Sequence, residues 1–170
     1  METAPAAGGD SAGIATYMTW RPILIRSTML ATALITLAGW AVPAQSAGTE
    51  IRVFKSPTCG CCAAWAEYAR SNGFEVRVEE IADMDKVKRD LGVPADLASC
   101  HTATAGGYVI EGHVPASSIR KLLKEHPANV KGIAVRGMPQ GSPGMSGTKS
   151  SPIEVVAFEK AGKTRLFDRW

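Results

Sequence analysis

The clustering of cysteine is the feature that most constrains this chain. Three of its four cysteines lie in the segment Cys59-Gly60-Cys61-Cys62, and the fourth is Cys100. The first group follows a short alternating run at 50–54 and opens a helix-like run at 62–71, so we expect its thiols at a helix N-terminus. Unpaired N–H groups and the helix dipole at such an end favour the thiolate, the form of cysteine that attacks disulfides and binds metals.

Residues 1–47 are predicted to be a leader and signal peptide rather than part of the fold. Two arginines, Arg21 and Arg26, precede an apolar stretch at 29–42, and a small-residue segment follows at 43–47. This is the layout of a secretory signal peptide. The apolar stretch is shorter than the roughly 20 residues that span a bilayer, and an uncleaved membrane anchor is the alternative.

The start and the end of this leader are both open. Residues 1–17 are polar and rich in Gly and Ala, so Met18 is a more natural start, and cleavage after Ala44 or Ala47 fits the small-residue segment. The remaining residues, 48–170, are enough for one domain. The net charge of +3 comes without a basic run, so the sequence gives no support for nucleic-acid binding.

Alternating strand-like and helix-like segments predict an α/β fold for residues 48–170. We expect strands at 50–54, 74–81 and 108–110, helices at 63–72, 83–91 and from Pro115 onward, and a C-terminal β-hairpin at 153–158 and 164–167, while 130–135 is ambiguous. This order, with cysteines near a βαβ unit, is typical of a thioredoxin-like domain. In that arrangement the loop carrying Cys100 faces Cys59 and Cys62.

The spacing of the cysteines favours metal binding over two other uses. Cys59 and Cys62 form a C-x-x-C pair that suits a redox disulfide, but the extra thiol of Cys61 invites reshuffling of that disulfide. Soft thiolates select Cu(I) and can bridge several ions. Structural zinc sites favour two separated pairs, which this pattern lacks. Structural disulfides are the third alternative, although neighbouring cysteines close almost no chain.

Histidines and methionines supply weaker candidate ligands. His113 follows the expected strand at 108–110, and His101 adjoins Cys100; each is a candidate either for metal binding or for hydrogen bonding. Met138 and Met145 flank a loop rich in Gly and Pro, where methionine has little core to fill. A thioether is a soft Cu(I) ligand that cannot be lost to disulfide formation.

Several motifs in order carry a resemblance to a known family. They run from about residue 51 to 167 and comprise Lys55-Ser56-Pro57-Thr58-Cys59-Gly60-Cys61-Cys62, Gly92-Val93-Pro94, Ser99-Cys100-His101-Thr102-Ala103, Gly107-Tyr108-Val109-Ile110-Glu111-Gly112-His113-Val114-Pro115 and Gly137-Met138-Pro139-Gln140-Gly141-Ser142-Pro143-Gly144-Met145. The chain resembles the domain-of-unknown-function family that includes the exported copper-resistance protein CopG.

The resemblance implies a thioredoxin-like fold, a bacterial periplasmic location and copper handling through a Cu(I)–thiolate cluster. Other periplasmic copper-handling proteins would be the partners. The implied metal site comprises Cys59, Cys61, Cys62 and Cys100, with Met138, His113 and Met145 as weaker candidates. The chain departs from the expected pattern at Tyr68, where a histidine is expected, and at 146–148, where an acidic residue is expected.

The sequence therefore predicts a Cu(I)-binding protein that sequesters copper or hands it on. An enzyme is the main alternative, either a thiol–disulfide oxidoreductase or a copper reductase that uses Cys59 and Cys62.

Overall fold

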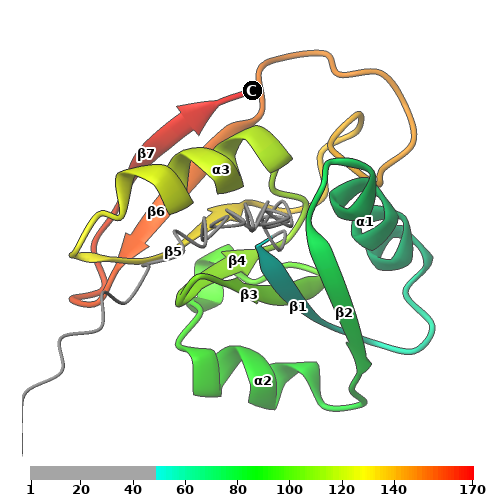
Figure 1. Cartoon of the computed structure of the whole chain (residues 1–170), viewed down its shortest axis with the longest axis horizontal. Helices are drawn as coiled ribbons and strands as arrows, with labels where there is room; N and C mark the ends of the chain where they lie inside the picture. The colour runs from blue at the N-terminus through cyan, green and yellow to red at the C-terminus, as the bar shows by residue number, and fades with distance from the viewer. Residues whose placement is uncertain (1–48) are drawn as a thin grey trace, which may run out of the picture. The chain divides into compact units, whose positions relative to one another are not determined.

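The computed structural model describes residues 49–170; the leader and signal peptide expected at 1–47 lie outside this part of the chain. The elements, in chain order, are β1 (Glu50–Lys55), α1 (Gly60–Ser71), β2 (Glu75–Glu80), α2 (Met84–Leu91), the 3₁₀ helix η1 (Ala95–Leu97), β3 (His101–Ala105), β4 (Tyr108–Glu111), α3 (Ala116–Glu125), β5 (Val130–Val135), β6 (Glu154–Glu159) and β7 (Thr164–Arg169) (Figure 1). These elements form a mixed α/β domain around one sheet.

The sheet has seven strands in the order β2-β1-β3-β4-β5-β6-β7. Two neighbouring pairs are parallel, β1 with β2 and β4 with β5, and each pair is joined by a segment that contains a helix. The other four pairs are antiparallel. The parallel pair β1–β2 places the turn at the end of β1 and the start of α1 at one end of the sheet, where the thiols of 59–62 lie.

Apolar side chains cover both faces of the sheet. One core cluster joins Trp65 and Ala69 of α1 to Ile119 and Leu122 of α3 across the strands. A smaller cluster on the other face contains Phe158 and other buried strand residues, and partly buried Leu91 of α2 packs against it. Accordingly, α1 and α3 lie on one side of the sheet and α2 on the other (Figure 1).

Several elements of the structure follow from local sequence signals. Gly92 adopts the left-handed conformation (φ 65°) that ends α2, as its position predicts. Ile119 and Leu122 lie on the buried face of α3, and Leu123 is half-buried. Both strands of the expected C-terminal hairpin are present as β6 and β7, and the ambiguous segment at 130–135 is β5.

The strand expected at 108–110 is present as β4, but the sequence prediction missed β3, which precedes it. After His101, β3 alternates between threonine and alanine and offers no large aliphatic signal. The missed signal is the pair Gly106-Gly107, both with positive φ, which joins Ala105 to its antiparallel partner Tyr108. Two glycines between strand-like runs are a hairpin turn, so β3 and β4 form a tight hairpin.

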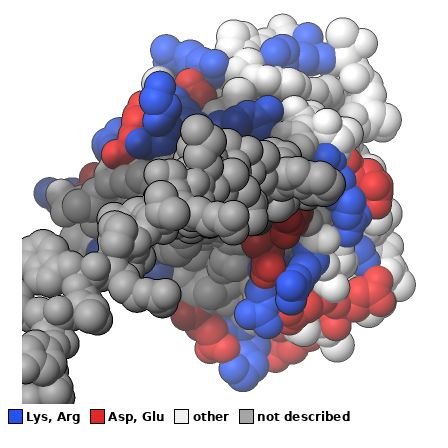
Figure 2. Space-filling model, in the orientation of Figure 1, with Lys and Arg blue, Asp and Glu red and all other residues white. Residues whose placement is uncertain are grey.

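Charges of both signs are mixed over the visible described surface in Figure 2, where Lys and Arg lie beside Asp and Glu. Exposed ion pairs such as Arg52–Glu79 and Lys86–Asp90 also bring opposite charges together on the surface. Within residues 49–170, no helix combines the length and the apolar character needed to cross a bilayer.

Candidate metal centre

The first group of cysteines lies where β1 ends and α1 begins. Cys59 caps the N-terminus of α1, and the backbone N of Ala63 donates to its carbonyl oxygen. Cys59 and Cys62 form a disulfide, whereas Cys61 is a free thiol whose Sγ lies 3.6 Å from the Sγ of Cys59. Cys62 is fully buried, and the other two are half-buried. At this end of α1, Cys59 of the disulfide is therefore partly accessible to solvent, and Cys62 is not.

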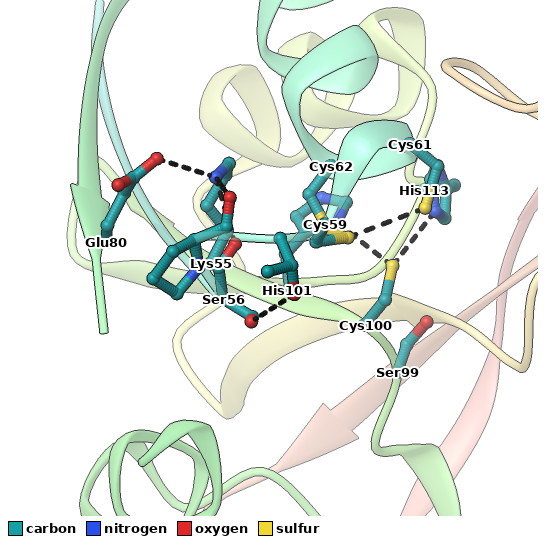
Figure 3. Close-up of a disulfide and its surroundings, with 12 residues drawn as sticks. Lys55, Ser56, Cys59, Cys61, Cys62, Glu80, Ser99, Cys100, His101 and His113 are labelled. Atoms are coloured by element: carbon teal, nitrogen blue, oxygen red, sulfur yellow. Dashed lines mark hydrogen bonds and ion pairs between the residues drawn. A yellow bond between two sulfur atoms is a disulfide. The ribbon is translucent and has the colours of Figure 1, made fainter. Parts of the chain in front are cut away.

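A buried lysine holds the turn that leads into these cysteines. The Nζ of Lys55 donates to the carbonyl oxygens of Ser56 (2.9 Å) and Pro57 (3.4 Å), and it pairs with Glu80 at 3.0 Å. Figure 3 shows these contacts beside the cysteines. The ammonium group thus ties the start of the turn to the neighbouring strand β2.

The second loop brings Cys100 to the same place. All four cysteine Sγ atoms lie within 4.8 Å of one another, which confirms that the two loops converge. Cys100 Sγ also lies 3.0 Å from Nε2 of His113 and 3.4 Å from Nδ1 of His101. These two histidines and Cys100 form a second group with the same mutual limit of 4.8 Å, so Cys100 belongs to both groups (Figure 3).

His113 is oriented with a lone pair toward Cys100. Its Nδ1 lies 2.7 Å from the carbonyl oxygen of Pro143, which can only accept, so Nδ1 carries the proton in the neutral ring. Burial lowers the pKa of His113, although the hydrogen bond to Pro143 opposes this shift. Nε2 then has its lone pair free for the Cys100 S–H or for a metal ion, and a backbone carbonyl behind a ligating imidazole is a common supporting contact.

His101 is enclosed still more completely. Burial, then the charges of His113 and Lys88, hold its pKa well below the usual value. Its ring packs 4.6 Å from that of Trp65, and its Nε2 is the one buried side-chain polar atom in residues 49–170 that lacks a hydrogen-bond partner. An orphaned buried nitrogen is costly. The ring nitrogen that faces Cys100 Sγ, at 3.4 Å, is Nδ1, so Nδ1 is the candidate ligand atom of His101.

The thiol of Cys100 is neutral in this arrangement. Burial, followed by the charge of Cys61, raises the pKa of Cys100 to about 11. The protonated sulfur can therefore donate to Nε2 of His113. Binding of a soft metal ion would release this proton, because the thiolate is the ligand.

Comparison with known proteins places these features in a family. The profile of a family described as "Protein of unknown function, DUF411" matches residues 97–145. Two solved structures, "Copper resistance protein copG- Form 2" and "Form 1", are each 40% identical to the chain, with TM-scores of 0.68 and 0.67. Each alignment covers 72% of this chain and 98% of the other. The chain belongs to the CopG family. No match was found among curated proteins.

Within this CopG-family chain, the loop at 137–145 packs against the start of α1. The turn there carries Cys59, Cys61 and Cys62 and is called the thiol turn below. A Cβ added at Gly144 would lie 2.6 Å from the backbone N of Trp65 and 2.9 Å from the carbonyl oxygen of Cys61. The same loop supplies the Pro143 carbonyl that orients His113. Met138, at its start, is 54% exposed, and Met145, at its end, is half-buried. Their role as ligands stays a prediction.

Two positions are better explained by the structure than by the sequence. Tyr68, where a histidine was expected, has a structural contact: its hydroxyl accepts from the backbone N of Ala116 at 3.1 Å. His101 joins the site because alternation along β3 turns it toward α1, while Thr102 contacts Lys88 on the other face. Recognising β3 in the sequence would have revealed the side on which His101 lies.

Proposed function

We propose that this CopG-family chain binds Cu(I) through the thiolates of Cys59, Cys61, Cys62 and Cys100. The observation that carries the proposal is the convergence of four sulfur atoms and two neutral imidazoles at one end of the sheet. Thiolate sulfur is the soft donor that Cu(I) prefers, and imidazole also binds copper. His113 and His101 are the imidazole candidates, and more than one ion fits a set of bridging thiolates.

The methionine-bearing loop is the weaker part of the proposed site. Gly144 packs against α1 beside Cys61, so Met145 enters the neighbourhood of the thiol turn. Met138 is more exposed, which suits a thioether that meets copper as it enters or leaves. We propose both as accessory ligands.

Loading with copper requires a change of redox state. The structure holds the Cys59–Cys62 disulfide, so only Cys61 and Cys100 are thiols. Two thiols of a reductant would supply two electrons and two protons, which breaks this S–S bond, yields two further thiols and converts the reductant to a disulfide. The protons of these thiols would be released when copper binds. The proposed protein therefore alternates between a reduced, copper-loaded form and an oxidised, empty form.

The proposed setting is the bacterial periplasm. Residues 1–47, with translation starting at Met18 or Met1, would direct export and be removed, leaving 48–170 as a thioredoxin-like metal-binding domain. The unit β1–α1–β2, with cysteines at the helix N-terminus, supports the thioredoxin-like assignment. Copper would be sequestered there or exchanged with other periplasmic copper-handling proteins.

A second candidate is an enzyme that uses Cys59 and Cys62 for thiol–disulfide exchange or for copper reduction. The specific observation is the disulfide at a helix N-terminus, with Cys59 half-exposed and Cys62 buried. A partner thiolate could attack Cys59 Sγ, forming a mixed disulfide and releasing Cys62 as the thiolate. Reduction of insulin that depends on Cys59 would favour this candidate.

An anaerobic Cu(I) titration of the reduced protein against a chromophoric chelator tests the proposal. We expect tight binding of more than one copper ion, weakened in Cys100→Ser. The matched control is His126→Gln, which changes an exposed histidine at the C-terminus of α3 and should bind as the wild type does. Absent binding, or binding that Cys100→Ser leaves unchanged, would overturn the four-thiolate site.

A further inference from the structure

A buried carboxylate lies behind the Cys100 loop without touching the sulfur atoms. The side chain of Glu111 is fully buried and pairs through Oε1 with Nζ of Lys88 at 2.6 Å. The same Oε1 accepts from the backbone N of Ser99 at 2.6 Å, and Oε2 accepts from the hydroxyl of Thr102 at 2.7 Å. Lys88 also donates to Thr102 at 3.0 Å, which completes a closed network.

Stability alone is a weak reason for such a network. Taking an ion pair out of water is costly, and well-packed apolar side chains of similar volume often serve as well or better. This network has one feature that an apolar replacement could not reproduce. It provides an acceptor for the N–H of Ser99, the residue immediately before Cys100.

Ser99 is fixed by further contacts from other elements. Its hydroxyl donates to the carbonyl oxygen of Gly137 at 2.9 Å. It also packs against Gly112, where an added Cβ would lie 2.7 Å from Ser99 Oγ. The Cys100 loop is therefore held by β4, by Gly137 of the loop at 137–145 and, through Lys88, by α2.

We propose that Glu111 and Lys88 are positioning residues that fix Cys100 opposite the thiols of α1. The carboxylate holds the backbone of Ser99, and the ammonium compensates the charge of the carboxylate. With this backbone fixed, Cys100 Sγ stays within 4.8 Å of the other three sulfurs and 3.0 Å from His113. The inference rests on the proposed copper site and assigns it a support on the opposite face of the sheet.

Three variants separate positioning from stability. Glu111→Gln keeps an oxygen that can accept from Ser99 N–H. Glu111→Leu removes the acceptor and leaves Lys88 buried without its partner. The double variant Lys88→Met/Glu111→Leu removes both charges but still lacks the acceptor. As a matched control, Lys121→Met/Asp168→Leu removes an ion pair between α3 and β7.

Thermal unfolding and Cu(I) affinity are measured on each full-length protein. We expect Glu111→Leu to lower both the unfolding midpoint and the affinity. The double variant should regain most of the midpoint but keep an affinity lower by on the order of 10–100-fold, as for other residues that orient metal ligands. Glu111→Gln and the control pair should bind copper within a few-fold of wild type. Wild-type affinity in the double variant would overturn the proposal.

A second measurement does not depend on copper. In the protein with the Cys59–Cys62 disulfide intact, diamide accepts two electrons and two protons from the thiols of Cys61 and Cys100 and is reduced to its hydrazine. The Cys61–Cys100 disulfide that forms is detected by intact mass and peptide mapping. We expect this disulfide to form at least several-fold more slowly in the double variant than in wild type or the control pair. Equal rates would overturn positioning, whereas absent copper binding by the wild type would overturn only the proposed function.

Discussion

The two cysteine loops reach the same point by different means. The loop at 56–62 supplies three sulfurs through one turn of helix, and Lys55 ties it down through two neighbouring carbonyl oxygens and Glu80. The loop at 99–100 supplies one sulfur, and its contacts come from α2, β4 and the loop that follows β5. The first loop is held mainly through its own carbonyl oxygens, with Glu80 as a contact from outside, and the second by contacts from other elements.

The charges that support the loops also differ in their access to water. Glu80 is 57% exposed, so it can turn into solvent when Lys55 is removed. Glu111 is fully buried and cannot. Since an unpaired charge is costly only where water cannot reach it, the Cys100 loop should be the more fragile of the two.

The sharpest test of this comparison is to remove each buried lysine. Lys88→Met leaves the Glu111 carboxylate buried and unpaired, so the free energy of unfolding should fall by about 3–5 kcal/mol. Lys55→Met loses charged hydrogen bonds but leaves Glu80 near water, so its cost should be smaller, about 1.5–3 kcal/mol. Urea denaturation of the oxidised proteins at pH 7 measures both.

A copper titration of the same two variants tells which loop each lysine supports. Lys88→Met should weaken copper binding through Cys100, and adding Glu111→Leu should restore stability more than affinity. If Lys55→Met proves as destabilising as Lys88→Met, the contrast between a solvent-accessible and a buried partner is wrong.

The contact between the loop at 137–145 and α1 gives the next largest effect. Gly144 and Gly137 both have positive φ, so alanine at either position costs about 1–2 kcal/mol of backbone strain. At Gly144 the added methyl would also meet the backbone of Trp65 and Cys61, whereas at Gly137 nothing lies within 4 Å. Overpacking should make Gly144→Ala less stable than Gly137→Ala by a further amount of about 1–3 kcal/mol.

This pair of variants also tests whether the loop orients His113. A shift of the loop at Gly144 would move the neighbouring Pro143 carbonyl away from Nδ1 of His113. Gly144→Ala should therefore lower copper affinity more than Gly137→Ala does, because Gly137 meets the site only through its carbonyl oxygen, which accepts from the hydroxyl of Ser99. Equal effects of the two variants on both measurements would show that the close contact has no influence on the site.

The same division between local and distant contacts explains what the sequence could predict. The helix N-terminus with Cys59 and Cys62, the left-handed Gly92 and the final hairpin follow from short-range patterns, and all appear in the structure. The strand β3 did not follow, because small residues such as Ala103 carry no strong strand signal. Its hairpin partner and the burial of both its faces give it stability instead.

The site shows the same pattern. That Cys100 would meet the other cysteines was predictable from the order of elements, and the distances confirm it. The place of His101 was not, because it depends on the unrecognised strand. Nor was the role of Glu111, since its partners Lys88 and Ser99 come from separate elements and a carboxylate in sequence gives no sign of burial.

Acidification should lower the free energy of unfolding through the two buried histidines beside Cys100. Burial holds the pKa of His113 and of His101 below the usual value, so the folded, copper-free protein keeps both neutral. The unfolded chain binds protons there near pH 6.5. Stability contributed by these neutral rings is therefore present above pH 6.5 and is lost as pH falls toward the folded-state pKa values, with a slope of up to about 1.4 kcal/mol per pH unit for each histidine.

Urea denaturation between pH 7 and pH 5 measures this slope. His113→Gln should make the slope shallower than in wild type, because one of the two histidines whose pKa is lowered in the folded protein is gone. A slope that the substitution leaves unchanged would show that His113 does not carry the pH dependence. Copper binding should weaken over the same range, since protons compete with the metal for thiolate and imidazole.

The smallest expected effect comes from neutralising the exposed partner of Lys55. Glu80→Gln removes one charge of a pair in which Glu80 is 57% exposed, so solvent screening limits the loss to about 0–1 kcal/mol. Lys55 retains the carbonyl oxygens of Ser56 and Pro57, and the thiol turn should keep its position. We therefore expect a urea midpoint and a Cu(I) affinity close to those of the wild type.

A large loss of affinity with an unchanged midpoint would mean that the charge of Glu80, rather than the hydrogen bonds from Lys55 to the carbonyl oxygens, supports the first loop. The two loops would then both depend on a carboxylate, and the contrast between them would lie only in its depth of burial.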